Sequence, residues 1–383
     1  MPRDEPARSV SRAAAEALLA RRYAPAAVAA TAWERLEPWE VARVRLAGPG
    51  VPERLIVKWV RAHPDRTRSA RWRVRTEVAA LRFLADDLGF GAAPRLITAD
   101  IATGVVVLED LGPRVPLDGV LREGGAAAHR ERLLAFARVR GELGAASAGR
   151  AEDYYARRAA LGAVDPAADR AGRWSGFRDE GIRVAARIGA EISGGAGREL
   201  EVALGELAEP RGFLALSNGD PEANNVLVHA SGAPDARLID FEFAGYTHAL
   251  HDAVCLFVPG PGWLSVGDAI GIGAGDAYRR ALAAGVPEAQ DDARYGRGLA
   301  AACVSYALVR LCRVPTLDGR APGDGSRPQL VATLEAAART AGAFRALPRL
   351  AGWAWRAAEA LRRRWPDADV DLSAVPAYAP RGR

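Results

Sequence analysis

The sequence predicts an α+β fold with two lobes, in which a small antiparallel β-sheet lobe precedes a larger helical lobe. Three short β-rich runs stand close together near the N-terminus, and Gly48-Pro49-Gly50 forms the turn between the last two. A helical pattern and two more β-rich runs follow, and beyond Pro113 the pattern becomes mainly helical. Because 383 residues exceed the usual size of one domain, we expect two or three folding units.

The elements of the small lobe follow from the residue patterns in chain order. An alanine-rich stretch from Val10 to Ala24, with serines near its start, predicts a helix ahead of the sheet. The three β-rich runs predict an antiparallel meander, and the next helix runs from about Arg73 to Leu88 and ends at Gly89. Two further strands complete a five-stranded lobe. The predicted strands are 28–35, 40–46, 54–60, 95–99 and 104–108.

Amphipathic segments predict most of the larger lobe as helices. A β-hairpin between Asn225 and Phe241 interrupts these segments, and the Gly/Pro-rich stretches 194–197 and 315–328 predict mobile loops. The predicted helices are 130–143, 176–192, 268–284, 294–312, 328–345 and 349–364.

Charge and composition argue against several classes of function. The 52 basic and 47 acidic residues give a net charge of only +5, which does not favour a nucleic-acid or membrane-surface partner. The longest apolar stretch, Leu299 to Leu311, is shorter than the roughly 20 residues that cross a bilayer, and the N-terminus lacks the apolar core of a secretory signal. Cys255, Cys303 and Cys312 have no metal-ligand spacing, so we expect reduced core cysteines in a cytoplasmic protein.

The chain contains a single lysine, Lys58, among 52 basic residues. A GC-rich genome explains a general loss of lysines, but a lysine that persists points to a function for which the planar guanidinium is a poor substitute. On the helix that follows, Glu77 shares the apolar face with Val74 and Val78, where an unpaired carboxylate is destabilising. We therefore expect a Lys58–Glu77 ion pair. In the alternative, Lys58 is an ordinary surface residue and Glu77 is solvated at the edge of that face.

A second group of polar residues surrounds the predicted hairpin. If the turn centres near Gly232 and Ala233, antiparallel register sets Asn225 opposite Asp240 on one face. An amide oxygen and a carboxylate there would suit Mg²⁺. Asp220 precedes Asn225 by five residues in a loop, where it could accept a proton from an attacking hydroxyl. Taken singly, each of these residues is more often a structural turn or strand-end residue.

In this order along the chain, the residues resemble the kinase-like small-molecule phosphotransferases, which include aminoglycoside phosphotransferases and choline/ethanolamine kinases. A strand lysine followed about twenty residues later by an inward helix glutamate is how kinase folds hold a lysine against nucleotide phosphates. The resemblance extends from about Ala27 to Phe257. It is carried by LIVKWV at 55–60, Glu77, VVVLEDLG at 105–112, SNGDPEANNVLV at 217–228 and LIDFEFAGYTHALHDAV at 238–254.

The resemblance implies a protein-kinase-like fold and a role for each matching residue. It implies Asp220 as the catalytic base, Asn225 and Asp240 as metal ligands, and Asp252 as a structural acid at the end of the second motif. The nucleotide would contact Lys58, held by Glu77, and the backbone of the hinge formed by Glu109, Asp110 and Leu111.

The domain organisation that follows has four parts. Residues 1–26 form an N-terminal helical extension, 27–108 a β-rich nucleotide-binding N-lobe and 109–114 the hinge. Residues 115–383 form a helical C-lobe with the catalytic loop and the substrate site.

The function that the resemblance implies is an ATP- or GTP-dependent O-phosphotransferase that uses Mg²⁺. It would phosphorylate a hydroxyl of a small molecule, such as an antibiotic, an aminoglycoside-like compound, a nucleoside or an amino alcohol. Glu222 and Glu242 are expected near the acceptor, where they would attract a cationic group or be solvated. The arginine-rich C-terminal segment argues mildly against a strongly polycationic aminoglycoside.

Two alternatives remain open. The Asp240-Phe241-Glu242 sequence favours a choline/ethanolamine-type kinase. A non-catalytic nucleotide-binding pseudokinase is favoured by Asn218, which replaces the usual histidine, and by the absence of glycine from the turn 36–39. The oligomeric state does not follow from the sequence.

Overall fold

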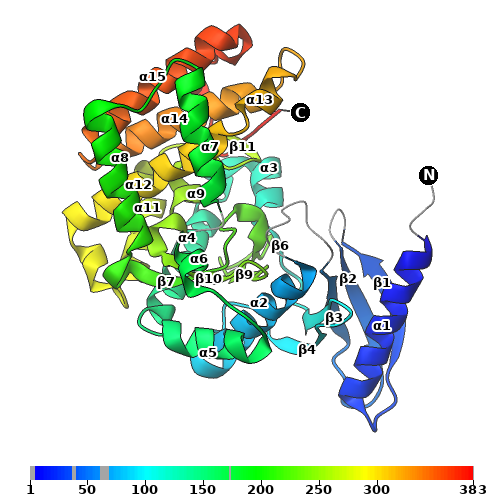
Figure 1. The fold of residues 1–383 in the computed structure, drawn as a ribbon. Coiled ribbons are helices and arrows are strands. Elements are labelled where there is room, and N and C mark those ends of the chain that lie inside the picture. The colour runs from blue at the N-terminus through cyan, green and yellow to red at the C-terminus, as the bar shows by residue number, and fades with distance from the viewer. Residues whose placement is uncertain (1–4, 37–39, 61–68, 172–173, 383) are drawn as a thin grey trace. The chain divides into compact units, whose positions relative to one another are not determined.

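The computed structural model describes residues 5–36, 40–60, 69–171 and 174–382, and these residues form two compact units (Figure 1). Unit 1 comprises Met1–Arg114, Glu152–Val164 and Arg237–Ala244. Unit 2 comprises Val115–Ala151, Asp165–Ala236 and Gly245–Arg383. A small unit with an antiparallel sheet and a larger helical unit confirm the predicted α+β class.

Unit 1 is built on a five-stranded antiparallel sheet in the order β1-β2-β3-β5-β4. Every second residue of β2 is buried, as expected for a sheet with one face in the core. Helix α1 packs Leu18 and Leu19 against Val44, Leu55 and Val57 of that face, alongside the sheet in Figure 1. The strands are β1 (Ala29–Arg35), β2 (Val41–Ala47), β3 (Arg54–Trp59), β4 (Leu96–Asp100) and β5 (Val105–Glu109), and α1 spans Glu5–Tyr23.

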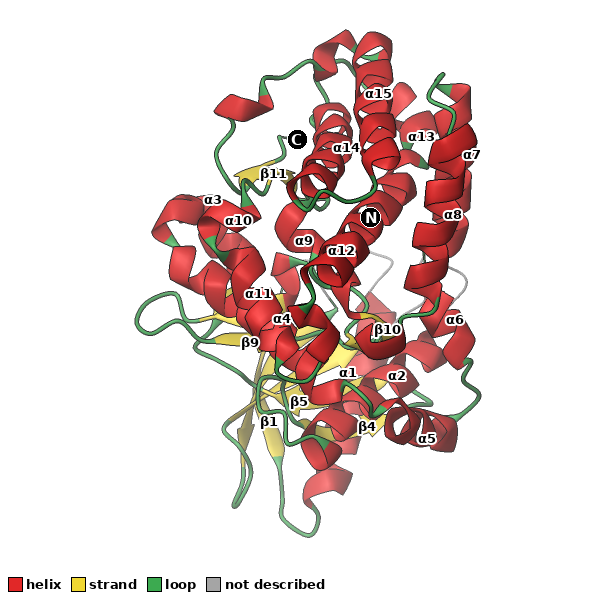
Figure 2. Ribbon diagram, turned by 90° about the vertical axis from the view of Figure 1, so that its left-hand side faces the viewer, coloured by secondary structure: helices red, strands yellow, loops and turns green. Residues whose placement is uncertain are grey.

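The second helix of unit 1, α2 (Ala70–Arg82), is followed by a π-helical turn at Phe83–Asp87. Ser69 caps α2, since its hydroxyl accepts a hydrogen bond from the amide of Trp72 at 3.2 Å. Figure 2 shows α2 among the other helices in red and the strands of the sheet in yellow.

Two segments that the predicted organisation places in the C-lobe pack within unit 1. In α5 (Ala151–Leu161), the ring of Tyr154 lies edge-on to that of Phe83, with 5.7 Å between centroids. In 237–244, the amide of Leu238 donates to the carbonyl of Ala92 at 2.8 Å. These contacts join residues far apart in sequence, so local patterns do not predict them.

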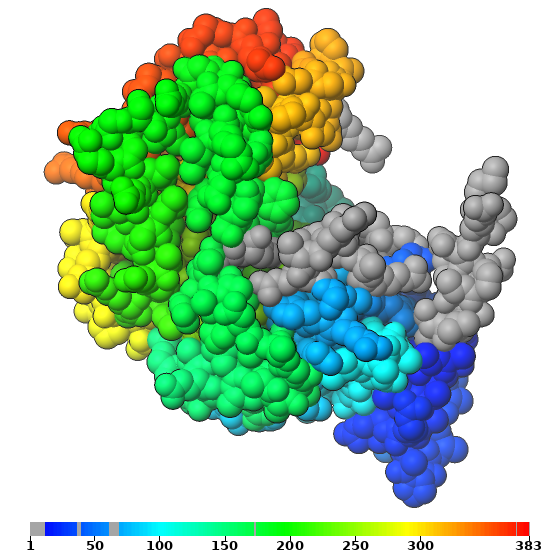
Figure 3. All heavy atoms as spheres, viewed as in Figure 1, coloured from blue at the N-terminus to red at the C-terminus, as the bar shows by residue number. Residues whose placement is uncertain are grey.

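Unit 2 is mainly helical, and its long helix α12 is buried along most of its length. Helices α7 and α8 pack on α12 and, in green, make up much of the face of unit 2 shown in Figure 3. Its longer helices are α3 (Leu117–Ala128), α4 (Arg130–Ser147), α7 (Ser175–Arg187), α8 (Gly194–Ala208), α11 (Ala274–Ala283), α12 (Asp292–Leu311), α14 (Ser326–Ala343) and α15 (Pro348–Arg364). Its shorter helices are α6 (Pro166–Ala171), α9 (Val254–Phe257), α10 (Ala269–Ile272) and α13 (Val314–Asp318).

Short antiparallel strand pairs hold the loops of unit 2. They are β6 (Val115–Pro116) with β8 (Val226–Val228), β7 (Leu214–Ser217) with β10 (Gly245–His248), and β11 (Trp263–Ser265) with β12 (Ala379–Pro380). The predicted hairpin is shorter than expected: after β8, the strand β9 (Ala236–Leu238) ends before Asp240.

Both predicted loops differ from the structure. Residues 194–197 begin α8. In 315–328, α13 continues to Asp318 and α14 begins at Ser326, so only 319–325 lack regular structure. A Cβ atom at Gly195 would lie 2.1 Å from Nη1 of Arg349, so a larger residue there would require that flexible side chain to move. The predicted helix 268–284 is divided at Gly273, whose φ of 87° is in the left-handed region. Gly195 therefore lies in a helix next to Arg349, and Gly273 interrupts the helix predicted for 268–284.

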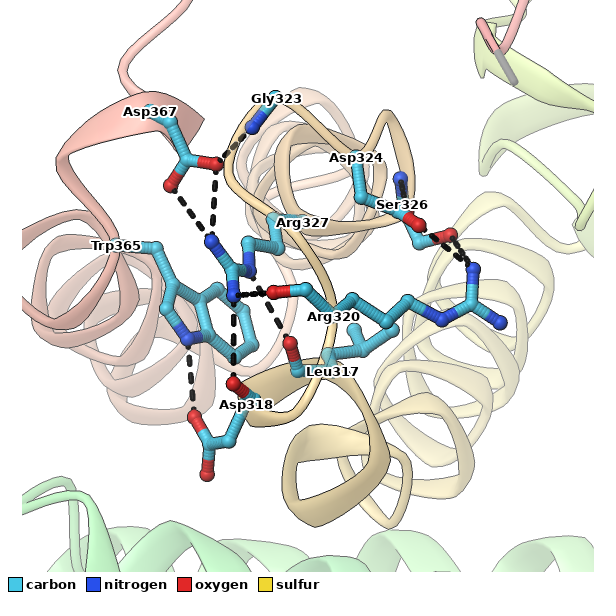
Figure 4. Close-up of polar contacts among 9 residues, drawn as sticks. All are labelled: Leu317, Asp318, Arg320, Gly323, Asp324, Ser326, Arg327, Trp365 and Asp367. Carbon is cyan, nitrogen blue, oxygen red and sulfur yellow. Dashed lines mark hydrogen bonds and ion pairs between the residues drawn. The ribbon is translucent and has the colours of Figure 1, made fainter.

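Arg327 of α14 holds the segment 317–325 in place (Figure 4). The Arg327 side chain is buried, its Nε donates to the carbonyl of Leu317 at 3.1 Å, and one Nη donates to that of Arg320 at 2.6 Å. Its other Nη donates to Asp367, near the C-terminus, at 3.0 Å. One guanidinium thus satisfies several polar groups of a segment that has little regular structure.

Replacing Arg327 with leucine is expected to lower the free energy of unfolding by about 1–3 kcal/mol, because the Asp367 carboxylate and the carbonyls of Leu317 and Arg320 each lose a hydrogen-bond donor. Urea denaturation measures this loss. The control is Arg363→Ala, which removes an exposed 4.0 Å ion pair with Glu359 and should change stability by less than about 1 kcal/mol. Equal effects of both substitutions would contradict the role given to Arg327.

His248, at the end of β10, is buried in its neutral form. Its ring stacks on Phe213 with 4.9 Å between centroids, and its Nδ1 accepts a hydrogen bond from the amide of Leu250 at 3.3 Å. Burial, together with the nearby His251, lowers the pKa of His248 to about 3.

This depressed pKa predicts a stability that falls in acid. Below about pH 6.5 the unfolded chain binds a proton at His248 while the folded chain does not, until the pH nears 3. We expect His248→Gln to reduce the slope of unfolding free energy against pH between 6.5 and 4.5. Urea titrations at several pH values test this, and identical slopes for wild type and His248→Gln would contradict it.

Two further predictions from the sequence concern the cysteines and membrane-spanning helices. Cys255 and Cys303 are buried free thiols, and burial raises the pKa of both, as expected of unreactive core cysteines. Among the described residues, the structure contains no helix with the length and apolar character needed to cross a membrane.

Candidate active site

Unit 1 contains the Lys58–Glu77 ion pair that the sequence predicts. Lys58 lies on β3 between Val41 of β2 and Val106 of β5, and Glu77 lies on the buried face of α2. The ammonium Nζ is 2.9 Å from Glu77 Oε2 and 3.1 Å from Oε1. The Glu77 side chain is only 1% exposed, so Lys58 neutralises a carboxylate that water does not reach.

Two more carboxylates meet the same ammonium. Asp240 Oδ1 lies 2.5 Å and Glu242 Oε2 3.1 Å from Lys58 Nζ. Arg73 of α2 forms an ion pair with Glu242 and lies over the ring of Phe243. The resulting cluster has three acids and two cations, and it joins β3, α2 and the segment 237–244.

The charges of this cluster shift the pKa values of Lys58 and Glu77. Burial alone would lower the pKa of Lys58, but Asp240, Glu77 and Glu242 raise it above its usual value, so the ammonium stays charged. Burial raises the pKa of Glu77, and the nearby Asp240 and Glu242 add to this, while Lys58 opposes it. The three carboxylates repel one another, and further positive charge would stabilise them.

The donor set of the cluster fits a hard divalent cation. Oxygen atoms of Glu77, Asp240 and Glu242 lie within 4.8 Å of one another. The Asp240 side chain is 32% exposed, whereas those of Glu77 and Glu242 are almost completely buried. Asp240 has a φ of 63°, a left-handed conformation that aspartate tolerates. Within this cluster, Asp240 is therefore the carboxylate most accessible to an ion.

In unit 2, the loop after β7 carries Asp220 and is held by Ser217 and Asn218. Ser217 Oγ donates to Asp252 Oδ1 at 2.5 Å and accepts from the amide of Gly219 at 2.9 Å. Gly219 has a φ of 79°, which favours glycine. Asp252 thus has the structural role that the resemblance implies for it.

Asn218 is completely buried, and its Oδ1 accepts a hydrogen bond from Arg140 Nη1 at 2.7 Å. Arg140 lies on α4, is 1% exposed, and its Nη1 is 3.7 Å from Asp252 Oδ2. Asn218 therefore links the loop to a buried arginine, a structural role that explains a polar residue here. The sequence analysis missed Arg140, although its helical spacing to the apolar Phe136, Ala137 and Leu143 was a signal.

Asn225 is buried in the short 3₁₀ turn Ala223–Asn225. Its Nδ2 donates to the carbonyl of Asp220 at 3.0 Å, and its Oδ1 accepts from Asn224 Nδ2 at 3.0 Å. Asn225 therefore fixes the backbone that carries Asp220 and presents an oxygen donor. Asn225 precedes β8 and Asp240 follows β9, so both lie outside the strands, and their facing register remains a prediction.

Glu222 lies two residues after Asp220 and is half-buried, with its carboxylate against Gly260, where a Cβ atom would be 2.2 Å from Oε2. Burial and the neighbouring Asp220 raise the pKa of Glu222 to about 7, while Arg310 and Arg140 oppose this. Glu242, by contrast, belongs to unit 1 and pairs with Lys58 and Arg73. The acceptor roles expected for both glutamates remain predictions.

The predicted hinge has well-defined contacts in unit 1. Asp110 is a largely buried carboxylate that accepts from Arg43 Nε at 2.8 Å and from the amide of Gly112 at 2.9 Å. Glu109 accepts from the amide of Arg95 at 3.1 Å, and the carbonyl of Leu111 accepts from Arg114 at 3.0 Å. These side chains hold the shape of the segment. Its adenine contact remains a prediction, and most of the turn 36–39 lies outside the described residues.

Several solved structures are similar to this one. The choline/ethanolamine kinase family protein from Mesorhizobium loti is 19% identical, with 92% of this chain and 99% of that chain covered and a TM-score of 0.49. A putative aminoglycoside phosphotransferase from Ralstonia eutropha JMP134 is 15% identical, with 91% and 98% covered and a TM-score of 0.46. A macrolide 2′-phosphotransferase from Brachybacterium faecium is 17% identical, with 80% and 92% covered and a TM-score of 0.46.

No curated protein matches the sequence. A family model described as the phosphotransferase enzyme family, APH, matches residues 37–291, which is most of the chain. This match confirms the resemblance predicted from the motifs, and with it the predictions of a kinase-like fold and of a small-molecule kinase. The chain belongs to the phosphotransferase enzyme family.

Proposed function

We propose that this protein transfers the γ-phosphoryl group of ATP or GTP to a hydroxyl of a small molecule and requires Mg²⁺. The observation that carries the proposal is the cluster at Lys58, where one ammonium stays charged among Glu77, Asp240 and Glu242. Nucleotide phosphates are anions that such an ammonium can bind, and phosphoryl transfer depends mainly on positioning and on stabilising negative charge.

Asp220 is the base in this proposal. Its carboxylate accepts the proton of the acceptor hydroxyl as the oxygen attacks the γ-phosphorus and the bond to the β-phosphate oxygen breaks. The hydrogen bond from Asn225 to the Asp220 carbonyl and the buried Arg140–Asn218 contact support its placement, since they limit movement of the loop backbone.

Asn225 and Asp240 would hold the metal. The donor set supports this assignment, since an amide oxygen and an accessible carboxylate are ligands that Mg²⁺ accepts together with water and phosphate oxygens. A bound Mg²⁺ would neutralise charge on the β- and γ-phosphates. Glu77 and Glu242 then act as positioning residues that hold Lys58, and Arg73 in turn holds Glu242.

This position of Glu242 weakens the case for a choline-type kinase. A carboxylate that already pairs with Lys58 and Arg73 would have to leave both cations to meet an ammonium on an acceptor. Glu222 of unit 2 has no such ion pair among the described residues and is the better candidate for contact with the acceptor.

The test is nucleotide consumption by the purified full-length chain. ATP and GTP are each supplied with Mg²⁺ or with EDTA against a library of hydroxylated small molecules, and phosphorylated products are identified by mass. We expect Mg²⁺-dependent transfer that Asp220→Asn abolishes. The pseudokinase alternative would be favoured if the protein bound nucleotide, transferred phosphate to no acceptor, and consumed nucleotide at the same rate as Asp220→Asn.

A further inference from the structure

Helix α12 carries two polar side chains that interact electrostatically with the loop of Asp220 and Glu222. Tyr306 and Arg310 lie four residues apart on this helix, hence on the same face, and both are half-buried. Burial raises the pKa of the Tyr306 hydroxyl, with Glu222 and Asp220 adding to the effect and Arg310 opposing it. Tyr306 is therefore within electrostatic range of Glu222 and Asp220, and Arg310 is within electrostatic range of Glu222.

Two more arginines join Arg310. Arg313 lies three residues further on, directly before α13. Arg381 follows β12, and its amide donates to the carbonyl of Gly262 at 3.1 Å. Gly260, against which the Glu222 carboxylate lies, is two residues before Gly262. The segment 260–262 thus connects Arg381 to the neighbourhood of Glu222.

These three guanidinium groups have no carboxylate within 4.0 Å in the part of the chain that the structure describes. Other arginines nearby are paired: Arg320 lies 2.9 Å from Asp324 and Arg122 3.8 Å from Asp118. Arg310, Arg313 and Arg381 are nevertheless half-buried. Asp324 opposes the lowering of the Arg381 pKa, although its carboxylate is too distant to form an ion pair with Arg381.

The arrangement is electrostatically unfavourable by itself. Burial lowers the pKa of Arg313, and Arg310, Arg320 and Arg381 lower it further by repulsion. Burial likewise lowers the pKa of Arg381. Cations partly removed from water are stabilised by an anion, and the guanidinium fork suits the paired oxygens of a carboxylate or a phosphate.

We infer that the acceptor carries an anionic group, a carboxylate or a phosphate, which Arg310, Arg313 and Arg381 bind while its hydroxyl faces Asp220. The inference rests on the proposed function, because only that function makes the bound molecule the acceptor. It narrows the acceptor to hydroxy acids and phosphorylated alcohols. Glu222 and Asp220 form the acidic end of this site and the three arginines form the basic end, so an acceptor of either kind has one orientation.

The first experiment measures anion binding and does not depend on catalysis. Inorganic phosphate is titrated into the full-length chain by calorimetry, in wild type, in Arg310→Gln/Arg313→Gln and in Arg363→Gln, which changes an exposed arginine of α15. We expect the double variant to bind phosphate at least about tenfold more weakly and Arg363→Gln to match wild type.

Folding is checked in the same variants. Because the substitutions remove repulsion and break no ion pair, the double variant should have a Tm no lower than that of wild type. A large fall in Tm would mean that the arginines support the fold. That result, or phosphate binding that is absent or unchanged by the double substitution, would overturn the inference.

The second experiment identifies the acceptor class with matched pairs that differ in one anionic group. L-serine is compared with ethanolamine, and glycerol 3-phosphate with glycerol, which separates carboxylate from phosphate. We expect the anionic member of a pair to be preferred and its KM to rise in Arg310→Gln with a smaller change in kcat. Preference for the uncharged or cationic members would overturn the inference while the proposed function stands. Phosphate binding that depends on the arginines, with no transfer to any acceptor, would instead retain the anion site and reject the proposed function.

Discussion

Replacement of Asp220 with asparagine is expected to lower turnover by about 10²–10⁴-fold while nucleotide binding stays close to that of wild type. The substitution keeps the size of the side chain and removes the charge that accepts the proton. The contacts that hold the loop use the backbone of Asp220, through Asn225, and the side chain of Asn218, so they survive the change. Steady-state kinetics and calorimetry with Mg²⁺ and a nonhydrolysable nucleotide measure the two effects.

Asp240→Asn is the matched control for this prediction. The same change of charge at a proposed metal ligand should raise the Mg²⁺ concentration needed for half-maximal nucleotide binding. If Asp220→Asn and Asp240→Asn had the same Mg²⁺ dependence and the same affinity, the separate roles of base and metal ligand would have to be abandoned.

Lys58→Met is expected to abolish nucleotide use and to destabilise unit 1 as well. Removing the ammonium leaves Glu77 and Glu242 almost completely buried; Glu242 keeps its ion pair with Arg73, while Glu77 loses the ammonium that neutralises it. Breaking a buried ion pair in this way lowers the free energy of unfolding by about 3–5 kcal/mol. Lys58→Arg keeps the charge, so it should fold, but its planar head cannot take the position of the ammonium and turnover should fall.

A double variant separates these two effects. Glu77→Gln in the Lys58→Met background removes one of the unpaired buried charges, so stability should recover in part while activity stays absent. Urea denaturation and the nucleotide assay are run on the same samples. Wild-type turnover in Lys58→Arg, or recovery of activity in the double variant, would show that Lys58 does not bind the phosphates.

The sequence determined the elements whose residues carry a regular local pattern. Alternation predicted the five strands of unit 1 to within one or two residues, and helical periodicity predicted the helices now seen as α4, α12, α14 and α15. The Lys58–Glu77 pair was also predictable, because a glutamate on an apolar helix face needs a cation and the preceding strand holds the only lysine. Asp220, Asn225 and Asp240 were identified from the predicted hairpin register and from the motif resemblance.

Only the tertiary structure decided which charges meet across long sequence separations. Glu242 pairs with Arg73, 169 residues away, and Asn218 pairs with Arg140, 78 residues away. Arg310, near the end of α12, and Arg381, just after β12, both act electrostatically on Arg313. Local patterns report whether a side chain is buried but not which distant charge it meets. With 51 arginines and 47 acids, the number of possible pairs is too large for sequence to select among them, and the packing of the helices and sheet makes that choice.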